Sequence, residues 1–220
     1  MLKKRDHNDT DEIITFFSEE KGKIEFLAKS TKKIKSKNSY LLEPFSLLEV
    51  YSAQGKSWDR VTKLDSVKYF PELRKNTKKG LIADYSVKLI DKLTQISEKN
   101  SRVFKLLLSY LLFLQKNSLN PFVVDAFVLQ LFSILGFKPD LSLIDHISGF
   151  SLKKGCFKSQ NGDHIIRCNE ETAEKLRRAL KFDFQKSAEC SLDAQMHDII
   201  YQFGDYHLEQ KLPDWRKIIK

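Results

Sequence analysis

Hydrophobic side chains in the first third of the chain occur in short runs, which alternate roughly with polar residues and are separated by polar turns. This pattern is typical of β-strands that follow one another without intervening helices. The turn signal is clearest at Glu19–Gly22. The runs are Ile13–Phe17, Lys23–Ala28, Phe45–Tyr51 and Trp58–Leu64, with Met1–Arg5 as a short fifth piece. The pattern predicts a small barrel or sandwich in residues 1–70.

From Pro71 onward the apolar positions recur every three to four residues, which predicts helices. Val103–Leu114 is apolar nearly all round and predicts a central, buried helix. The segment 80–96 places one apolar stripe on a helix, formed by Leu81, Ile82, Tyr85, Leu89 and Leu93. The sequence therefore predicts two domains, 1–70 and 71–220.

Capping residues mark further helices in the second domain. Asn120 and Pro121 are an N-cap and a first-turn proline, and Gly136 ends the helix that follows. Segments 169–182 and 191–209 are predicted to be helical, with Asn169 and Ser191 as N-caps. Together with the strands, these helices predict an α+β protein.

Composition and charge add information about partners. The net charge is +9, and residues 1–80 hold 18 basic and 12 acidic side chains, against 20 and 17 in residues 81–220. The denser positive excess in the first third indicates an anionic partner there. The three cysteines form no paired pattern, which favours a reducing compartment. We expect a cytoplasmic protein with no signal peptide and no membrane partner, because no apolar run is long enough to span a bilayer.

Two lysine-rich segments are the candidate binding residues. The segment 21–37 holds seven lysines against one glutamate, and the segment RKNTKK, residues 74–79, has no acidic residue. If these segments lie on one face they could follow a phosphate backbone, whereas the alternative is two unrelated solvated loops. The predicted nucleic-acid-binding residues are Lys29, Lys32, Lys33, Lys35, Lys37, Arg74, Lys75, Lys78 and Lys79. Nearby aromatic residues could stack on bases, although most strand aromatics are core residues; they are Phe26, Tyr40, Phe45 and Trp58.

Catalytic and metal sites are not predicted. The acidic residues near the N-terminus, Asp6, Asp9, Asp11 and Glu12, fit a turn better than a metal-dependent nuclease site. No phosphate-binding glycine loop or nucleophile motif is present, so we expect no enzyme activity. Zinc-capable residues between positions 145 and 168 show no C-x2-C or H-x3-H pair; they are Asp145, His146, Cys156, His164 and Cys168.

Three stretches together resemble the bacterial recombination mediator family RecO. Asp9–Val50 is similar to the opening pattern of that family, with Leu42–Phe45, LEPF, at its "LQPF" position. Leu129–Leu141 is similar to its "LLGYxPxL" helix end, and Tyr206–Ile218 to its terminal segment. The resemblance covers nearly the whole chain, and the first stretch is the most specific.

The resemblance implies an N-terminal OB-fold followed by a helical C-terminal domain with a short hairpin insertion at about 142–168. It implies binding of single- and double-stranded DNA, strand annealing, and a nucleoid-associated location. It also implies partnership with RecR and with the single-stranded DNA-binding protein SSB, and indirect help in loading RecA. The alternative from the residues is a protein–protein adaptor of the repair machinery that no longer binds DNA.

The chain departs from the family pattern in several places. It begins in the middle of the family's first strand, so either the true start lies upstream or the edge of the barrel is short. Ser30 replaces the glycine usual after "LAK", and Asp125 stands where arginine is often found, which predicts weaker binding of the acidic SSB tail.

The zinc site that many relatives carry is predicted to be lost, and no cofactor is expected. The positions of its four cysteines hold Asp145, Ser148, Ile165 and Cys168, of which at most two could donate to a metal. Apolar packing is expected to hold the insertion instead, through Ile144, Ile147, Phe150, Phe157 and Ile165.

Overall fold

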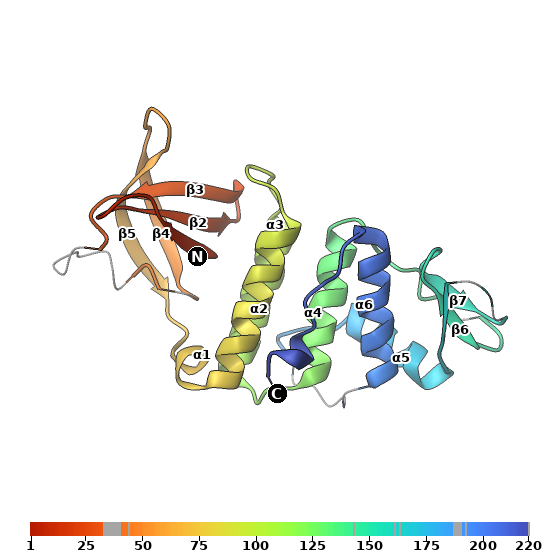
Figure 1. Cartoon of the computed structure of the whole chain (residues 1–220). Helices are drawn as coiled ribbons and strands as arrows, with labels where there is room; N and C mark the ends of the chain where they lie inside the picture. Colours follow the sequence, from red (N-terminus) through yellow and green to blue (C-terminus); the bar gives the residue numbers. More distant parts are fainter. Residues whose placement is uncertain are drawn as a thin grey trace. The chain divides into compact units, whose positions relative to one another are not determined.

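The computed structural model describes residues 1–32, 41–43, 45–142, 144–160, 162, 164–186, 191 and 193–219. The chain is α+β and divides into two compact units, Met1–Lys116 and Asn117–Lys220 (Figure 1). The change from strands to helices lies at Pro71, where the first helix begins.

A five-stranded sheet forms the first part of unit 1. Its strands are β1 (Lys3–Asp6), β2 (Glu12–Ser18), β3 (Gly22–Ala28), β4 (Leu47–Ala53) and β5 (Arg60–Lys68), in the order β1-β2-β3-β5-β4. Neighbouring strands are antiparallel except β3 and β5, which are parallel. In the described residues β1 and β4 do not pair, so the predicted barrel is an open sheet there.

Alternate residues of the strands form a buried cluster on one face of this sheet, and in β2 the residues of the other face, such as Ile13 and Thr15, are buried as well. Ile14, Phe16, Phe26 and Leu64 pack in a single cluster with exposures of 6% or less. The residues paired directly with one another across a sheet point to the same side, so this cluster defines the inner face. The predicted runs Phe45–Tyr51 and Trp58–Leu64 therefore correspond to β4 and β5, which begin two residues later than predicted.

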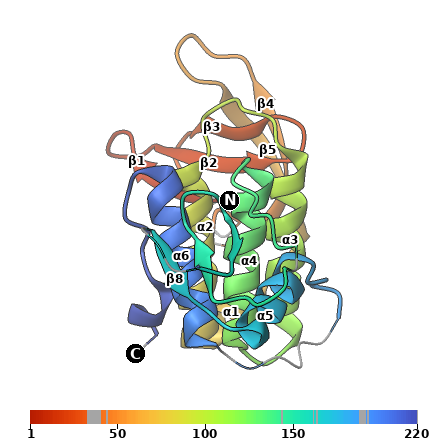
Figure 2. The ribbon, with the colours of Figure 1, turned by 90° about the vertical axis from the view of Figure 1, so that its right-hand side faces the viewer.

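In the described part of unit 1 the sheet is followed by three helices: α1 (Pro71–Lys75), α2 (Thr77–Leu93) and α3 (Ser101–Lys116). The end of α2 is joined to the sheet by Lys23, whose Nζ donates to the carbonyl oxygens of Asp91 and Thr94 at 2.6 and 2.9 Å. Figures 1 and 2 show the sheet at this end of α2 and α3, and α1 at the other end. Lys23 therefore fixes which end of α2 meets the sheet.

The described residues of unit 2 form three helices, a small sheet and a terminal 3-10 turn. The helices are α4 (Pro121–Ile134), α5 (Glu170–Leu180) and α6 (Ala194–Leu208), and the turn is η1 (Trp215–Lys217). The strands β6 (Gly149–Ser151), β7 (Cys156–Lys158) and β8 (Ile165–Arg167) form an antiparallel sheet in the order β7-β6-β8. The predicted hairpin insertion is thus a hairpin with a third strand added on the other side of β6.

Several helix predictions need correction. Leu81 does not belong to the buried stripe of α2, since it is 38% exposed while the adjacent Ile82 is fully buried. The helix buried on nearly all sides is α4, whereas α3 exposes Arg102 and Lys105. Asp193, not Ser191, caps α6, because its carboxylate accepts the N–H of Met196 at 3.0 Å. The N-caps predicted at Asn120 and Asn169 are confirmed.

The insertion is held by a smaller apolar group than predicted. Phe150 and Phe157 are buried, with their rings 5.7 Å apart, and Phe150 also packs on Phe203 of α6 at 5.8 Å. Ile144, in contrast, is 41% exposed, and Ile147 and Ile165 are only partly buried. Aromatic packing against α6 therefore replaces the isoleucine cluster.

Among the helices in the described residues, none has the length and apolar character needed to cross a membrane.

Candidate nucleic-acid interface

The first lysine group lies where β3 ends, beside the turn between β1 and β2. Lys29 is exposed and forms no ion pair with a described residue. Lys32 lies 2.9 Å from the carboxylate of Asp6 and donates to the carbonyl oxygen of Asn8 at 3.0 Å. Lys33, Lys35 and Lys37 lie outside the described residues. Part of the predicted charge at this place is therefore offset by Asp6.

The acidic residues of the same turn organise its backbone. A carboxylate oxygen of Asp11 accepts the N–H of Ser30 at 2.8 Å, and the other accepts from the Asn8 amide at 3.1 Å. These hydrogen bonds, that from Ser30 first, lower the pKa of Asp11. Ser30 itself has φ 56°, a left-handed conformation that favours glycine and explains the glycine of the family pattern. At Asp11 these contacts support the interpretation of the acidic cluster as part of a turn.

The second basic group lies at the junction of α1 and α2. Asn76 ends α1 and caps α2, where its side chain accepts the N–H of Lys79 at 3.1 Å. Lys75, Lys78 and Lys79 form no ion pair with any described residue. The first turn of α2 contains no acidic residue. These three cations consequently add to the positive end of the helix dipole and are available to an anion.

Arg74 is the most fixed member of this group. Its guanidinium lies 4.8 Å from the centroid of the Tyr69 ring and donates to the hydroxyl of Ser46 at 3.2 Å. These contacts join α1 to the residues that precede β4 and follow β5. Arg74 thus positions the junction as well as adding charge to it.

The two lysine groups follow different elements of unit 1, one the end of β3 and the other the end of α1. Lys79 and Asp91 are twelve residues apart on α2, which corresponds to ~18 Å along a helix. Lys23, at the start of β3, meets the Asp91 end of α2, whereas Lys29 follows the other end of β3. A single continuous binding face therefore stays a prediction.

The aromatic candidates divide into core and surface residues. Phe26 and Phe45 are buried, and Tyr40 lies outside the described residues. Trp58 is partly exposed, and the guanidinium of Arg5 lies 5.5 Å from the centroid of its ring. Only Trp58 among the described candidates can therefore offer a ring to a ligand.

The sequence interpretation missed exposed residues on the outer face of β4 and β5. Tyr51 is 49% exposed, and Lys63 Nζ lies 5.1 Å from the centroid of its ring. Arg60 is exposed and unpaired within the described residues. Strand alternation could have shown that these side chains point outward, because Tyr51 and Lys63 are next to Val50 and Leu64, which point inward.

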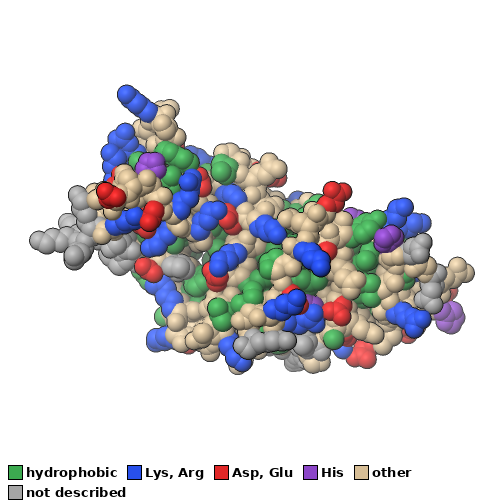
Figure 3. Space-filling view, in the orientation of Figure 1, with side chains coloured by type: hydrophobic (Ala, Val, Ile, Leu, Met, Phe, Trp, Pro, Cys, Tyr) green, Lys and Arg blue, Asp and Glu red, His purple; other side chains and the backbone are tan. Residues whose placement is uncertain are grey.

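Carboxylates offset many cations of the sheet. Lys3 and Lys23 both pair with Asp91, Arg5 pairs with Glu25 at 3.2 Å, and Lys63 pairs with Asp65 at 2.6 Å. On the face drawn in Figure 3, Lys and Arg side chains lie among Asp and Glu side chains. The net charge of the sheet surface is therefore smaller than its lysine count indicates.

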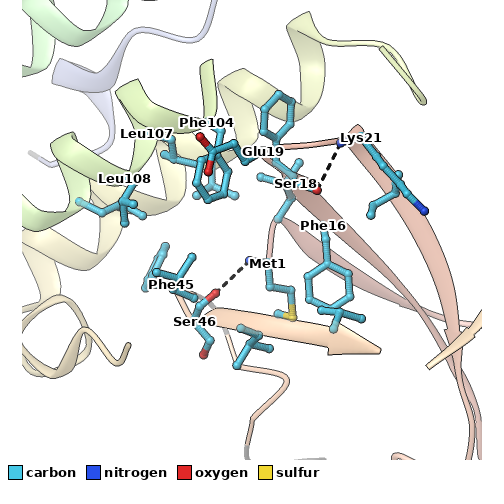
Figure 4. Close-up of a pocket in the computed structure, with 18 of the residues that line it drawn as sticks. Met1, Phe16, Ser18, Glu19, Lys21, Phe45, Ser46, Phe104, Leu107 and Leu108 are labelled. Carbon is cyan, nitrogen blue, oxygen red and sulfur yellow. Dashed lines mark hydrogen bonds between the residues drawn. The ribbon is translucent and has the colours of Figure 1, made fainter. Parts of the chain in front are cut away.

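A cavity of about 330 Å³ lies in unit 1 between the inner face of the sheet and α3. Most of the residues that line it are apolar, among them Phe16, Phe45 and Leu107, and Ser18 and Glu19 line it as well (Figure 4). The Met1 amine donates to the carbonyl oxygen of Ser46 at 3.1 Å inside it. Among the described residues, none of the predicted DNA-binding lysines lines this cavity.

Asp125 in unit 2 is a core residue, so the prediction that it faces an acidic tail is wrong. It is fully buried on α4, and one carboxylate oxygen accepts from Trp215 Nε1 at 2.7 Å and lies 2.9 Å from His197 Nδ1. Burial raises its pKa, against the opposing effects of His197 and Trp215. Asp214 lies on the other side of His197, 3.3 Å from Nε2. This network holds the C-terminal segment on α4 and α6.

The positions of the family's zinc ligands do not fit a four-donor site here. The Ser148 hydroxyl donates to the carbonyl oxygen of Lys158 at 3.2 Å, and Asp145 is exposed. Cys168 is buried, and burial raises the pKa of its thiol to about 11, which disfavours the thiolate that zinc requires. In the described part of the chain no three possible metal ligands gather. The loss of zinc stays a prediction.

Comparisons with known proteins identify the family. Residues 1–70 match the sequence model of the recombination protein O N-terminal region, and residues 74–217 match that of its C-terminal region. The chain is similar to a DNA repair protein RecO of Pelotomaculum thermopropionicum, with 26% identity over 98% of this chain and 90% of the relative. It is also similar to a DNA repair protein RecO of Halalkalibacterium halodurans, with 24% identity over 91% of this chain and 84% of the relative. This chain therefore belongs to the recombination protein O (RecO) family.

Proposed function

We propose that this protein is a non-catalytic, sequence-independent DNA-binding mediator of recombinational DNA repair. It binds single- and double-stranded DNA, anneals complementary strands, and works with RecR, with SSB and indirectly with RecA. The family and the names of the relatives support a role in DNA repair. The binding step, annealing and the individual partners are expectations from the resemblance.

One observation carries the DNA-binding part: the unpaired cations at the junction of α1 and α2. Lys75, Lys78 and Lys79 have no ion-pair partner among the described residues and lie beside Arg74. Three unpaired cations within five residues repel one another, and a phosphate backbone would relieve that repulsion. Release of counterions from the DNA then supplies the affinity, independently of base sequence. Neutralised strands repel one another less, which favours their annealing.

We also propose that the sheet of unit 1 is the OB-type barrel of this family. The strand order β1-β2-β3-β5-β4, with β3 and β5 parallel, supports this assignment. Such barrels are five-stranded, follow a Greek-key order and are partly open. The open edges between β1 and β4 are compatible with it.

Salt dependence of DNA binding tests the proposal. Changing Lys75, Lys78 and Lys79 together to alanine should weaken binding to single- and double-stranded DNA alike. It should also reduce the slope of log affinity against log salt by roughly one unit per lost phosphate contact. A matched control is Lys88→Ala, which removes a cation paired with Asp84 on the same helix. Wild-type affinity and slope in the triple variant would show that the assignment is wrong.

A second candidate function is a protein–protein adaptor without DNA binding. The pairing of Lys3, Lys23 and Lys63 with carboxylates favours it, because it reduces the charge available to phosphates. An adaptor would show no salt-dependent binding to either form of DNA, so the same titration separates the two functions. A magnesium-dependent nuclease is a third possibility, and incubation with labelled DNA and magnesium tests it.

A further inference from the structure

The loop between β4 and β5 places Trp58, partly exposed, on the surface of unit 1. The carbonyl oxygen of Asp59 accepts the N–H of Leu27 in β3 at 2.8 Å, which ties the loop to the sheet. Gly55 approaches the backbone of Trp58 so closely that a Cβ there would lie 1.8 Å from the Trp58 carbonyl oxygen. The loop can therefore be built only with glycine at this position.

Two arginines flank this loop on the outer face of the sheet. Arg5 pairs with Ile13, Ile13 with Leu27, and Leu27 with Arg60, so the four residues form one row across β1, β2, β3 and β5. Paired residues point to the same side, which for this row is opposite to Ile14 and Phe26. Arg5 and Arg60 consequently lie on the same face.

The two arginines differ in the charge they can offer. Arg5 lies over the Trp58 ring and pairs with Glu25, so its charge is offset. Arg60 forms no ion pair within the described residues, and its Nε lies 3.7 Å from the place that a Cβ on Gly55 would occupy. A partly exposed indole thus lies in the same loop region as an unpaired guanidinium.

We propose that Trp58 stacks on an unpaired base while Arg60 contacts the adjacent phosphate, so that this face binds single-stranded nucleic acid in preference to a duplex. An aromatic ring accepts any base, because every base has a π-face. In a duplex the base faces are covered by their stacked neighbours and cannot reach the ring. The inference rests on the proposed DNA binding and adds strand preference to it, at a place other than the α1–α2 junction.

Tyr51 serves as a matched control on the same hairpin. It is exposed and also lies beside a cation, Lys63. Its hydroxyl, however, donates to Glu49 at 3.4 Å, and Lys63 pairs with Asp65. Two carboxylates next to this ring would repel the phosphate that accompanies a stacked base. We therefore expect Tyr51 to contribute nothing to DNA binding.

The test compares full-length wild type, Trp58→Ala, Trp58→Phe and Tyr51→Ala by fluorescence anisotropy, with labelled oligo(dT) and a duplex of equal length. Trp58→Ala should weaken oligo(dT) binding by about 5- to 100-fold, the range of alanine substitutions at stacking residues. Trp58→Phe should retain most of the affinity, Tyr51→Ala all of it, and duplex binding should not change. In wild type, oligo(dT) should quench Trp58 emission. Trp215 is 2% exposed, so its emission should change little and confirms that each variant is folded.

The outcomes separate this inference from the proposed function. Unchanged oligo(dT) binding by Trp58→Ala, or an equal loss for oligo(dT) and duplex, would overturn the stacking role alone. If the wild type bound neither ligand, the proposed DNA binding itself would be wrong, and the stacking role with it. Weakening by Tyr51→Ala equal to that by Trp58→Ala would show a general surface effect and would also overturn the inference.

Discussion

Removal of the Asp125 carboxylate should destabilise unit 2 strongly. In Asp125→Ala the buried N–H groups of Trp215 and His197 lose the oxygen that they share. Each buried donor without a partner costs about 1 to 3 kcal/mol, so the two together cost about 2 to 6 kcal/mol. We expect the free energy of unfolding to fall by about 2 to 6 kcal/mol, a large part of the stability of an ordinary domain.

Asp125→Asn should lie between the wild type and Asp125→Ala. Both donors reach the same oxygen, Oδ1, so an amide oxygen there can still accept from them. The other oxygen, Oδ2, is buried and has no hydrogen-bond partner in the described structure. An amide NH₂ in its place would lack an acceptor, which costs about 1 to 3 kcal/mol. The order of stability should therefore be wild type, asparagine, alanine.

Urea unfolding followed by tryptophan emission measures these differences. A Trp58→Phe background leaves Trp215, which contacts Asp125 directly, as the single reporter. The control is Asp198→Ala, which removes a half-exposed ion pair with Arg216 and should cost less than about 1 kcal/mol. A loss below about 1 kcal/mol in Asp125→Ala, or an equal loss in both variants, would refute the argument from burial.

Two further predictions concern unit 1. Ser30→Gly should raise the free energy of unfolding by about 0.5 to 1 kcal/mol in urea titrations, since glycine adopts φ 56° without strain, whereas Ser30→Ala should give no gain. Burial by itself raises the pKa of Asp91, but hydrogen bonds and charges from Lys3 and Lys23 outweigh it. They hold the pKa of Asp91 below its ordinary value of 3.8. The stability from this carboxylate is therefore present above that value and lost as the pH falls through the lowered pKa. Asp91→Asn should unfold more easily at pH 7, by about 1 to 2 kcal/mol, and the difference should narrow in thermal scans below about pH 4; a difference independent of pH would contradict this.

Local signals in the sequence were enough for many elements. The run Ile13–Phe17 and the turn before Lys23 predicted β2 and β3 because alternation and turn residues act over a few positions. Asn120 with Pro121, and Asn169, marked helix starts for the same reason, since a cap bonds to backbone groups within three residues. The lysine groups at Lys29–Lys32 and Arg74–Lys79 are also visible without a structure. Family membership followed from motifs spread along the chain and is confirmed.

Contacts between distant residues decided the rest. Asp125 looked like a surface charge, yet its burial depends on Trp215 and His197, which lie 90 and 72 residues away in the chain. Lys32 could be counted as a free cation until the fold brought Asp6 to it. The outward position of Trp58 depends on the parallel pairing of β3 with β5, which no local pattern specifies. Sequence periodicity therefore determined the elements, while the charges and rings that a ligand can reach were set by the partners that folding brings to them.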